Sequence, residues 1–279
     1  MERILTIQDI SCVGKCSLTV ALPIISAMGV EAAVIPTAVL STHTAFKGFT
    51  FRDLTGDIEP IIRHWQVEGI GFDALYTGYL GSLAQIQLVG QAFDAFKTPD
   101  NQIVIDPVMG DHGKLYAGFT PEFAREMAKL CARADVIVPN MTEACAMLDR
   151  PYVESGYDEA EIRALLAQLT ALGARCAVLT GVSFTPGQVG VMAYDAREDR
   201  FESYFREQVP VSFHGTGDIF ASTTVGALAR GLTLTEALRV AVDFTVDSIA
   251  LTAADPDHRW YGVNFEQALP ALVRRMEAT

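Results

Sequence analysis

The sequence alternates short, strongly apolar runs with longer amphipathic stretches over most of its length. The short runs have the length and the β-branched content of strands, and residues 103–105 and 136–138 are apolar at every position. A strand that is apolar on both faces is buried on both, as happens when helices cover each side of a parallel sheet. The pattern therefore predicts one α/β domain over residues 1–279, a three-layer sandwich with a mostly parallel central sheet and helices on both faces.

The same alternation predicts the order of the elements. Strands are expected at residues 3–7, 32–39, 73–78, 102–106, 135–139 and 176–181. Helices are expected between them, near residues 16–28, 57–68, 82–97, 121–132, 142–148 and 158–172. After residue 186 two segments, 189–195 and 200–207, are expected to form an antiparallel pair. Helices near 217–231, 234–253 and 265–277 complete the expected order.

Composition excludes several classes of protein. Half of the residues are hydrophobic and 20% are charged, which favours a deep core and little disorder. A formal net charge of −13 argues against nucleic-acid binding. No apolar run is long enough for a membrane span, and Asp9 comes too early for a signal peptide. The five scattered cysteines form no metal-binding pattern, so we expect structural thiols and a reducing cytoplasm.

Polar residues follow most of the predicted parallel strands. In open parallel sheets, ligands bind beyond the carboxyl ends of the strands, so these residues are the candidate site. They are Gln8, Asp9 and Ser11 after the first strand, Tyr79 after the third, Asp106 and Asp111 after the fourth, Asn140 and Glu143 after the fifth, and Thr180 and Gly181 at the sixth. Packing alone does not explain why so many strand ends deliver polar groups to one edge.

Residues 215–218, Gly-Thr-Gly-Asp, stand directly before a run of small and apolar residues that is predicted to be helical. The free backbone N–H groups and the positive dipole end of a helix start are suited to binding phosphate. The familiar alternatives are missing from the sequence. Residues 9–17 lack the first glycine of a P-loop, no G-x-G-x-x-G follows the first strand, and no G-x-S-x-G or H-E-x-x-H occurs.

Phosphoryl transfer is the chemistry that fits these residues. It needs donors for the transferred group, a metal held by oxygen ligands, and a group that positions or deprotonates the acceptor. The turn at Gly215, Thr216 and Gly217 could supply the donors, and Asp218 could take a proton from an acceptor hydroxyl. Oxygen ligands for Mg²⁺, direct or through water, could come from Asp106, Asp111, Asn140 and Glu143.

Simpler interpretations of these residues stay open. Asp218 could be only an acidic residue in the first turn of a helix, where it stabilises the dipole. Asp106, which precedes a proline, could end its strand as turn chemistry. The N-x-x-E spacing of Asn140 and Glu143 is also that of a helix capping box. His43 could be a histidine whose polar contacts are already satisfied, and Tyr79 could belong to the core.

The ordered set of motifs resembles the ribokinase-like superfamily of small-molecule kinases. GTGD at a helix start, N-x-x-E after an earlier strand and DPVMGD before that carry the resemblance. Within the superfamily, TIQDISCVGKCS (6–17), STHT (41–44), GYLGS (78–82) and DPVMG (106–110) resemble the pyridoxal/pyridoxamine kinases. The resemblance extends from Ile4 to the last predicted helices.

This resemblance implies an enzyme, commonly dimeric, that moves the γ-phosphoryl of ATP to the 5′-hydroxymethyl group of a vitamin B6 vitamer. It implies that Asp218 is the base and that Gly215 to Gly217 form the anion hole. The remaining matches are Asp106, Asn140 and Glu143 on the ATP–Mg²⁺ side, Asp111 and Thr180 near the phosphates or a monovalent cation such as K⁺, and His43, Thr44 and Tyr79 around the vitamer ring.

One departure leaves the vitamer preference open. Asp9, which with Ser11 belongs to the expected substrate side, stands where many pyridoxal kinases have a serine that contacts the ring. It could pair with a protonated ring nitrogen or a cationic amine, or point elsewhere. A hydroxymethylpyrimidine kinase, a non-catalytic ligand-binding relative and, less so, a dehydrogenase remain alternatives. Residues 41–55, with Gly48 as a hinge, are expected to be a substrate flap or a surface loop against a partner subunit.

Overall fold

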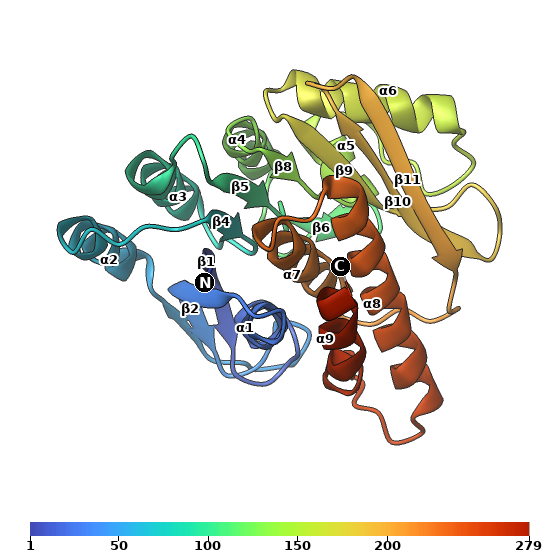
Figure 1. Ribbon diagram of the computed structural model, residues 1–279, viewed down its shortest axis with the longest axis horizontal. Coiled ribbons are helices and arrows are strands. Elements are labelled where there is room, and N and C mark those ends of the chain that lie inside the picture. Colours follow the sequence, from blue (N-terminus) through green and yellow to red (C-terminus); the bar gives the residue numbers. More distant parts are fainter. Residues whose placement is uncertain (279) are drawn as a thin grey trace.

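The central sheet places its parallel strands together and its antiparallel strands at the two edges (Figure 1). The structure is a computed structural model that describes residues 1–278. Within those residues the sheet has nine strands in the order β11-β10-β9-β8-β5-β4-β1-β2-β3. The parallel strands are β1 (Arg3–Ser11), β2 (Glu31–Leu40), β4 (Ala74–Thr77), β5 (Gln102–Ile105), β8 (Val136–Ile137) and β9 (Cys176–Val182). The antiparallel strands are β3 (Phe51–Asp53), β10 (Gln188–Asp195) and β11 (Arg200–Glu207).

Helices cover both faces of this sheet (Figure 1). One face carries α2 (Thr55–Val67), α3 (Leu83–Phe96), α4 (Pro121–Cys131), α5 (Met141–Met147) and α6 (Glu159–Ala171). The other carries α1 (Leu18–Ala27), α7 (Thr216–Ala229) and α8 (Leu234–Ala254), with α9 (Leu269–Ala278) packed against them. The three-layer prediction is therefore confirmed, as is the antiparallel pair after residue 186.

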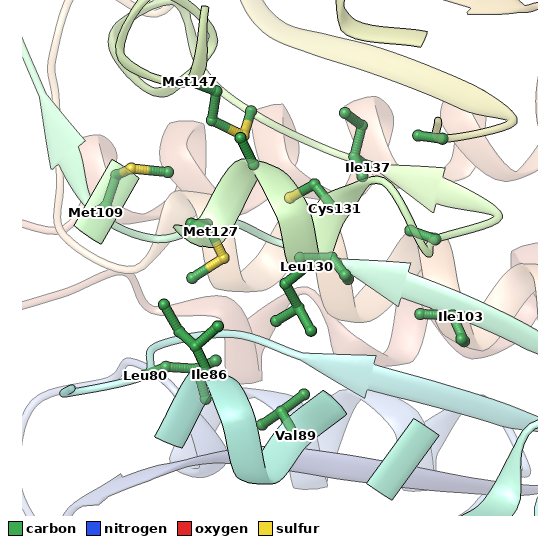
Figure 2. Packing of buried hydrophobic residues seen from close by; sticks show 14 of the residues in the cluster. Leu80, Ile86, Val89, Ile103, Met109, Met127, Leu130, Cys131, Ile137 and Met147 are labelled. Atoms are coloured by element: carbon green, nitrogen blue, oxygen red, sulfur yellow. The ribbon is translucent and has the colours of Figure 1, made fainter. Parts of the chain in front are cut away.

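Strand residues alternate between the two cores. Ile103 and Ile105 of β5 pack beneath α2 to α6, whereas Val104 packs beneath α1, α7 and α8. Figure 2 shows the first core, where Ile86 and Val89 of α3 lie close to Met127 and Leu130 of α4. Complete burial of one such side chain stabilises the fold by about 1.5–3 kcal/mol, which explains why the strands must be apolar on both faces. None of the helices described in residues 1–278 is long and apolar enough to span a lipid bilayer.

The structure differs from the predicted elements in a few places. A short strand, β3, pairs with β2 inside the expected flap, and a small ribbon of β6 (Gly110–Asp111) and β7 (Lys114–Leu115) follows β5. These strands are too short to show a period. The last helix begins later than expected, because residues 265–267 form a 3₁₀ turn and Pro270 favours a helix start near Leu269. Cys12, expected to be a packed thiol, is exposed.

Candidate active site

A cavity of about 340 Å³ opens at the carboxyl edge of the sheet. Its walls include ten of the residues expected from the sequence: Asp106, Asp111, Asn140, Glu143, Thr180, Gly181, Gly215, Thr216, Gly217 and Asp218. They come from the end of β5, from β6, from the start of α5, from β9 and from the start of α7, because the parallel strands and the helices that follow them meet at one edge of the sheet. The volume lies within the range of small-molecule sites. The structure thus brings together the residues that the sequence assigned to the nucleotide, the metal and the base.

The turn before α7 is built so that its backbone faces this cavity. Gly215 is the N-cap of α7 and has a left-handed conformation with φ 85°. A Cβ at this position would stand 2.1 Å from the carbonyl oxygen of Lys15, so only glycine fits. No side chain caps the helix, and its first N–H groups are left for an anion. Asp218 follows in the first turn, as the sequence predicts.

Acidic side chains are concentrated around the turn. Burial raises the pKa of Asp218 to about 7, the Ser17 backbone N–H opposes this rise, and the charge of Asp9 adds to it. Burial also raises the pKa of Asp106 well above its usual range, and the charges of Glu143 and Asp218 raise it further. A carboxyl group whose pKa is near neutrality has the property that general-base catalysis requires.

The capping-box interpretation of Asn140 and Glu143 is confirmed. The Asn140 side chain accepts from the Glu143 backbone N–H at 2.9 Å, and the Glu143 carboxylate accepts from the Asn140 backbone N–H at 2.9 Å. The other Glu143 oxygen accepts from the Met109 N–H at 3.1 Å. Burial nevertheless raises the pKa of Glu143 to about 7. Both residues also line the cavity, so their role in the cap does not exclude them from the site.

These oxygens fit a hard cation that is shared with a ligand. Within residues 1–278, no three acidic, histidine or cysteine side chains gather closely enough to form a metal cage of their own. Mg²⁺ is usually held by one or two carboxylates, with substrate phosphates and waters completing its shell. Asp106 and Glu143 beside the anion-binding turn match that arrangement, since a cation there would also offset their mutual repulsion.

The expected substrate-side residues Asp9 and Ser11 are not among the residues that line this cavity, although the charge of Asp9 acts on Asp218. Asp9 is buried, and its two carboxylate oxygens accept hydrogen bonds from the hydroxyls of Ser11 at 3.0 Å and Ser17 at 2.5 Å. Burial raises the pKa of Asp9, and these hydroxyls lower it. Tyr79 is close to this group, because the charge of Asp9 adds to burial in raising the tyrosine pKa. Asp9 therefore faces serine hydroxyls within the protein.

His43 joins the expected flap to the C-terminal segment. It is buried, its Nδ1 accepts from the Ala45 N–H at 3.1 Å, and its Nε2 lies 3.0 Å from the Tyr261 carbonyl oxygen. Burial lowers its pKa. Around it, the rings of Phe46 and Trp260 pack against each other with centroids 4.5 Å apart and planes tilted by 45°. The interpretation of His43 as a satisfied histidine is thus confirmed, while its neighbour Thr44 is exposed.

Comparison with known proteins shows the family. The model of the phosphomethylpyrimidine kinases matches residues 22–264. The chain belongs to this kinase family. A structure from Bacteroides thetaiotaomicron, described as a phosphomethylpyrimidine kinase and crystallised with pyridoxal, is 40% identical with a TM-score of 0.92, and the match covers 97% of this chain and 95% of that one.

Two further relatives of this kinase are named for vitamin B6. The pyridoxal kinase of Lactobacillus plantarum is 32% identical with a TM-score of 0.91, over 100% of this chain and 99% of that one. The pyridoxine/pyridoxal/pyridoxamine kinase of Bordetella avium is 26% identical over 264 residues, 89% of this chain and 85% of the relative. The structural matches confirm the ribokinase-like fold.

Sequence reasoning missed the apolar part of the kinase cavity. Val189 and Val191 of β10 line it together with Val242, Val246 and Ile249 of α8. The two strand valines are two residues apart, and the three helix residues are separated by four and then three positions. These are the spacings of ordinary core positions. The period shows that these side chains share a face. Only the packed structure shows that part of this face borders an open cavity.

Proposed function

We propose that this kinase transfers the γ-phosphoryl group of ATP to the 5′-hydroxymethyl group of a vitamin B6 vitamer, either pyridoxal, pyridoxine or pyridoxamine. The product is the 5′-phosphate, formed for the salvage of pyridoxal phosphate. The observation that carries the proposal is the position of Asp218, in the first turn of a helix with no side-chain cap, three residues after its N-cap Gly215, and at the wall of the cavity. The pyridoxal in the 40% identical relative supports the choice of acceptor.

In the proposed reaction, Asp218 accepts the proton of the acceptor hydroxyl while the hydroxyl oxygen attacks the γ-phosphorus. The bond between the γ-phosphorus and its bridging oxygen breaks, and ADP leaves. The N–H groups of Gly215, Thr216 and Gly217 donate to the transferring phosphoryl group, whose charge is spread over its outer oxygens. General-base assistance of this kind contributes about 10²–10⁴-fold to the rate.

The metal side is proposed from the oxygen donors of the cavity. Asp106 and Glu143 would hold Mg²⁺, partly through water, with Asn140 nearby, and Asp111 and Thr180 would lie near the phosphates or a monovalent cation such as K⁺. When bound, Mg²⁺ neutralises charge on the phosphate oxygens. The carboxyls of Asp106 and Glu143 are suited to this position because burial, and secondarily neighbouring negative charges, raise their pKa values, and a bound cation would favour their ionised forms.

The nucleotide and the vitamer would occupy opposite ends of the site. The slot between β10 and α8, lined by Val191, Val242 and Val246, offers apolar walls for the flat adenine ring. On the other side of Asp218, the proposed vitamer contacts are Asp9, Ser11, His43, Thr44 and Tyr79, beneath a flap formed by residues 41–55. The contact between the tilted rings of Phe46 and Trp260 supports a flap that can rest on the C-terminal segment.

Two further proposals concern the molecule as a whole. The five cysteines are free thiols, which supports a reducing, cytoplasmic location. Phe49 and Phe51 are exposed beside the edge strand β3, which supports an edge that a second copy covers in a homodimer.

The first experiment measures ADP release with Mg²⁺-ATP and, separately, pyridoxal, pyridoxine, pyridoxamine and hydroxymethylpyrimidine. Mass spectrometry identifies the phosphorylated product, and the Asp218→Asn variant measures background hydrolysis of ATP. We expect a B6 vitamer to have by far the largest kcat/KM. Phosphorylation of the pyrimidine alone would keep the mechanism but give the wrong acceptor, and the family model makes this the second candidate. If none of the four compounds is phosphorylated, the proposal is overturned.

A further inference from the structure

The ribbon of β6 and β7 lies at the wall of the cavity but is too short to hold its own position. Its two strands pair at two positions, and the turn between them consists of His112 and Gly113. Both turn residues have a positive φ, 48° and 75°, as a type I′ hairpin turn requires. An isolated two-stranded hairpin is at best marginally stable in water. Asp111 of this ribbon lines the cavity, so its position must be fixed by contacts from outside the ribbon.

The first turn of α5 holds the beginning of the ribbon. The Glu143 carboxylate accepts a hydrogen bond from the Met109 N–H at 3.1 Å. The Asn140 side-chain amide donates to the Gly110 carbonyl oxygen at 2.9 Å. Asn140 and Glu143 also line the cavity, so the ribbon and the proposed metal side are fixed to the same helix turn.

The tip of the ribbon has a third contact with this turn, through Thr142. The Thr142 hydroxyl accepts a hydrogen bond from the Gly113 N–H at 2.9 Å. The ring of Tyr152 also packs on the tip, since a Cβ at Gly113 would stand 2.5 Å from a ring carbon. Thr142 is 6% exposed and is not among the residues that line the cavity. Its hydroxyl is therefore placed to hold the tip of the ribbon and not to bind a ligand.

We propose that Thr142 is a positioning residue of the nucleotide site: its hydroxyl holds the tip of the ribbon against α5, and the ribbon holds Asp111 at the wall of the cavity. Asp111 directly precedes the two turn residues and pairs with Lys114 across the ribbon, so a displacement of the tip also displaces Asp111. The inference rests on the proposed function, because it takes Asp111 to lie near the phosphates of ATP.

The first test measures hydrogen exchange of single backbone amides by NMR, without nucleotide or acceptor. Thr142→Val keeps the shape of the side chain and cannot accept a hydrogen bond. In this variant the Gly113 amide should exchange about fivefold faster than in wild type, the effect of one lost hydrogen bond. Thr142→Ser keeps the hydroxyl and should keep the wild-type rate. If Thr142→Val does not fold, Thr142→Ala is the second variant, with the same expected increase, because alanine is favoured in helices.

Thr120→Val is the matched control. The Thr120 hydroxyl accepts from the Phe123 N–H at 3.3 Å at the start of α4, which packs against α5, and Thr120 does not line the cavity. Loss of this helix cap should speed exchange of the Phe123 amide and leave the Gly113 amide unchanged. An unchanged Gly113 rate in Thr142→Val, or the same rise in Thr120→Val, would overturn the proposal.

The second test measures binding of AMP-PCP with Mg²⁺ by calorimetry, which needs neither an acceptor nor turnover. Thr142→Val should weaken binding about fivefold, and both Thr142→Ser and Thr120→Val should stay within about twofold of wild type. In an Asp111→Asn background, Thr142→Val should change binding by less than about twofold, because the carboxylate that the ribbon positions is already missing. Additive effects of the two substitutions would overturn the proposal.

These measurements separate the inference from the proposed function. Faster exchange at Gly113 with unchanged binding of AMP-PCP would show that the ribbon does not act on the nucleotide, even if pyridoxal proves to be the acceptor. If no vitamer is phosphorylated, the proposed function fails, but weaker binding of AMP-PCP in Thr142→Val would still support the positioning role.

Discussion

Replacing Asp218 by asparagine should abolish most of the turnover and, at the same time, stabilise the fold. Asparagine keeps the shape of the side chain and cannot accept a proton at neutral pH. We expect kcat to fall by about 10²–10⁴-fold while ATP still binds, as for loss of a general base. Asp218→Ala should lose turnover by a similar factor. The gain in stability follows from the burial of the carboxyl and can be worked out from its pKa.

The native protein raises the pKa of Asp218 from 3.8 to about 7, so folding disfavours the ionised form. Below pH 3.8 the carboxyl is protonated in both states and this cost is absent. Between these values the native state retains a proton that the unfolded chain has lost, and stability falls as the pH rises. Above pH 7 the full cost remains, about 4 kcal/mol at about 1.4 kcal/mol for each pKa unit.

The asparagine variant, neutral in both states, should therefore unfold with a free energy about 2 kcal/mol higher than wild type at pH 5 and about 4 kcal/mol higher at pH 8. Urea unfolding at both pH values measures this difference. Asp195→Asn is a control of opposite sign. Burial alone would raise the pKa of Asp195, but hydrogen bonds from Arg175 and Cys176 lower it, so the ionised carboxylate stabilises the fold. Asp195→Asn should therefore lose stability at pH 8.

Two results would refute the reasoning about Asp218. A difference in unfolding free energy that does not change between pH 5 and pH 8 would mean that the carboxyl is not held with a raised pKa. Turnover near the wild-type rate in the asparagine variant would remove Asp218 from the role of base, whatever its pKa. The two measurements are independent, because unfolding requires neither ATP nor an acceptor.

Three further predictions address other parts of the site. Glu143→Gln should raise the Mg²⁺ concentration needed for half-maximal activity. Glu161→Gln, at the same place in the exposed capping box of α6, should not raise it, and equal metal dependence of the two variants would remove Glu143 from the metal side. Gly215→Ala should reduce both activity and melting temperature more than Gly231→Ala. Both glycines have a positive φ near 85°, but only a Cβ at Gly215 would stand against a backbone oxygen, at 2.1 Å. Similar losses in the two variants would argue against that contact. Val246→Asp should raise KM for ATP and leave KM for the acceptor within about twofold, and a rise in both would place the nucleotide elsewhere.

Much of the candidate site could be predicted from the sequence because parallel strands share one edge. Asp106, Asn140 and Thr180 are far apart in the chain, but the first two follow strands and Thr180 lies near the end of one, and the structure brings all three to one cavity. The glycine turn and Asp218 were predicted from the chemistry of a helix start. The dual use of Glu143, which caps α5 and also lines the cavity, could not be predicted, since N-x-x-E spacing is the same for either role.

By itself, the sequence determined the architecture. Residues that are apolar at consecutive strand positions, such as Ile103 and Val104, must be covered on both faces, and this requires helices on each side of the sheet. Local pattern also determined which residues reach the carboxyl edge. These properties depend on the spacing of apolar residues along the chain and on residues that are close in sequence.

The tertiary structure alone decided the rest. Val246 has the spacing of a core residue, and only the packing of α8 against β10 leaves a cavity beside it. The pKa of Asp218 near 7 arises from burial and from Asp9, more than two hundred positions earlier in the chain. The positive φ of Ser17 accompanies a hydrogen bond from its hydroxyl to Asp9 on the neighbouring strand, a contact that only the folded chain brings about. Desolvation and charge interactions depend on distance in space, which the order of residues along the chain does not encode.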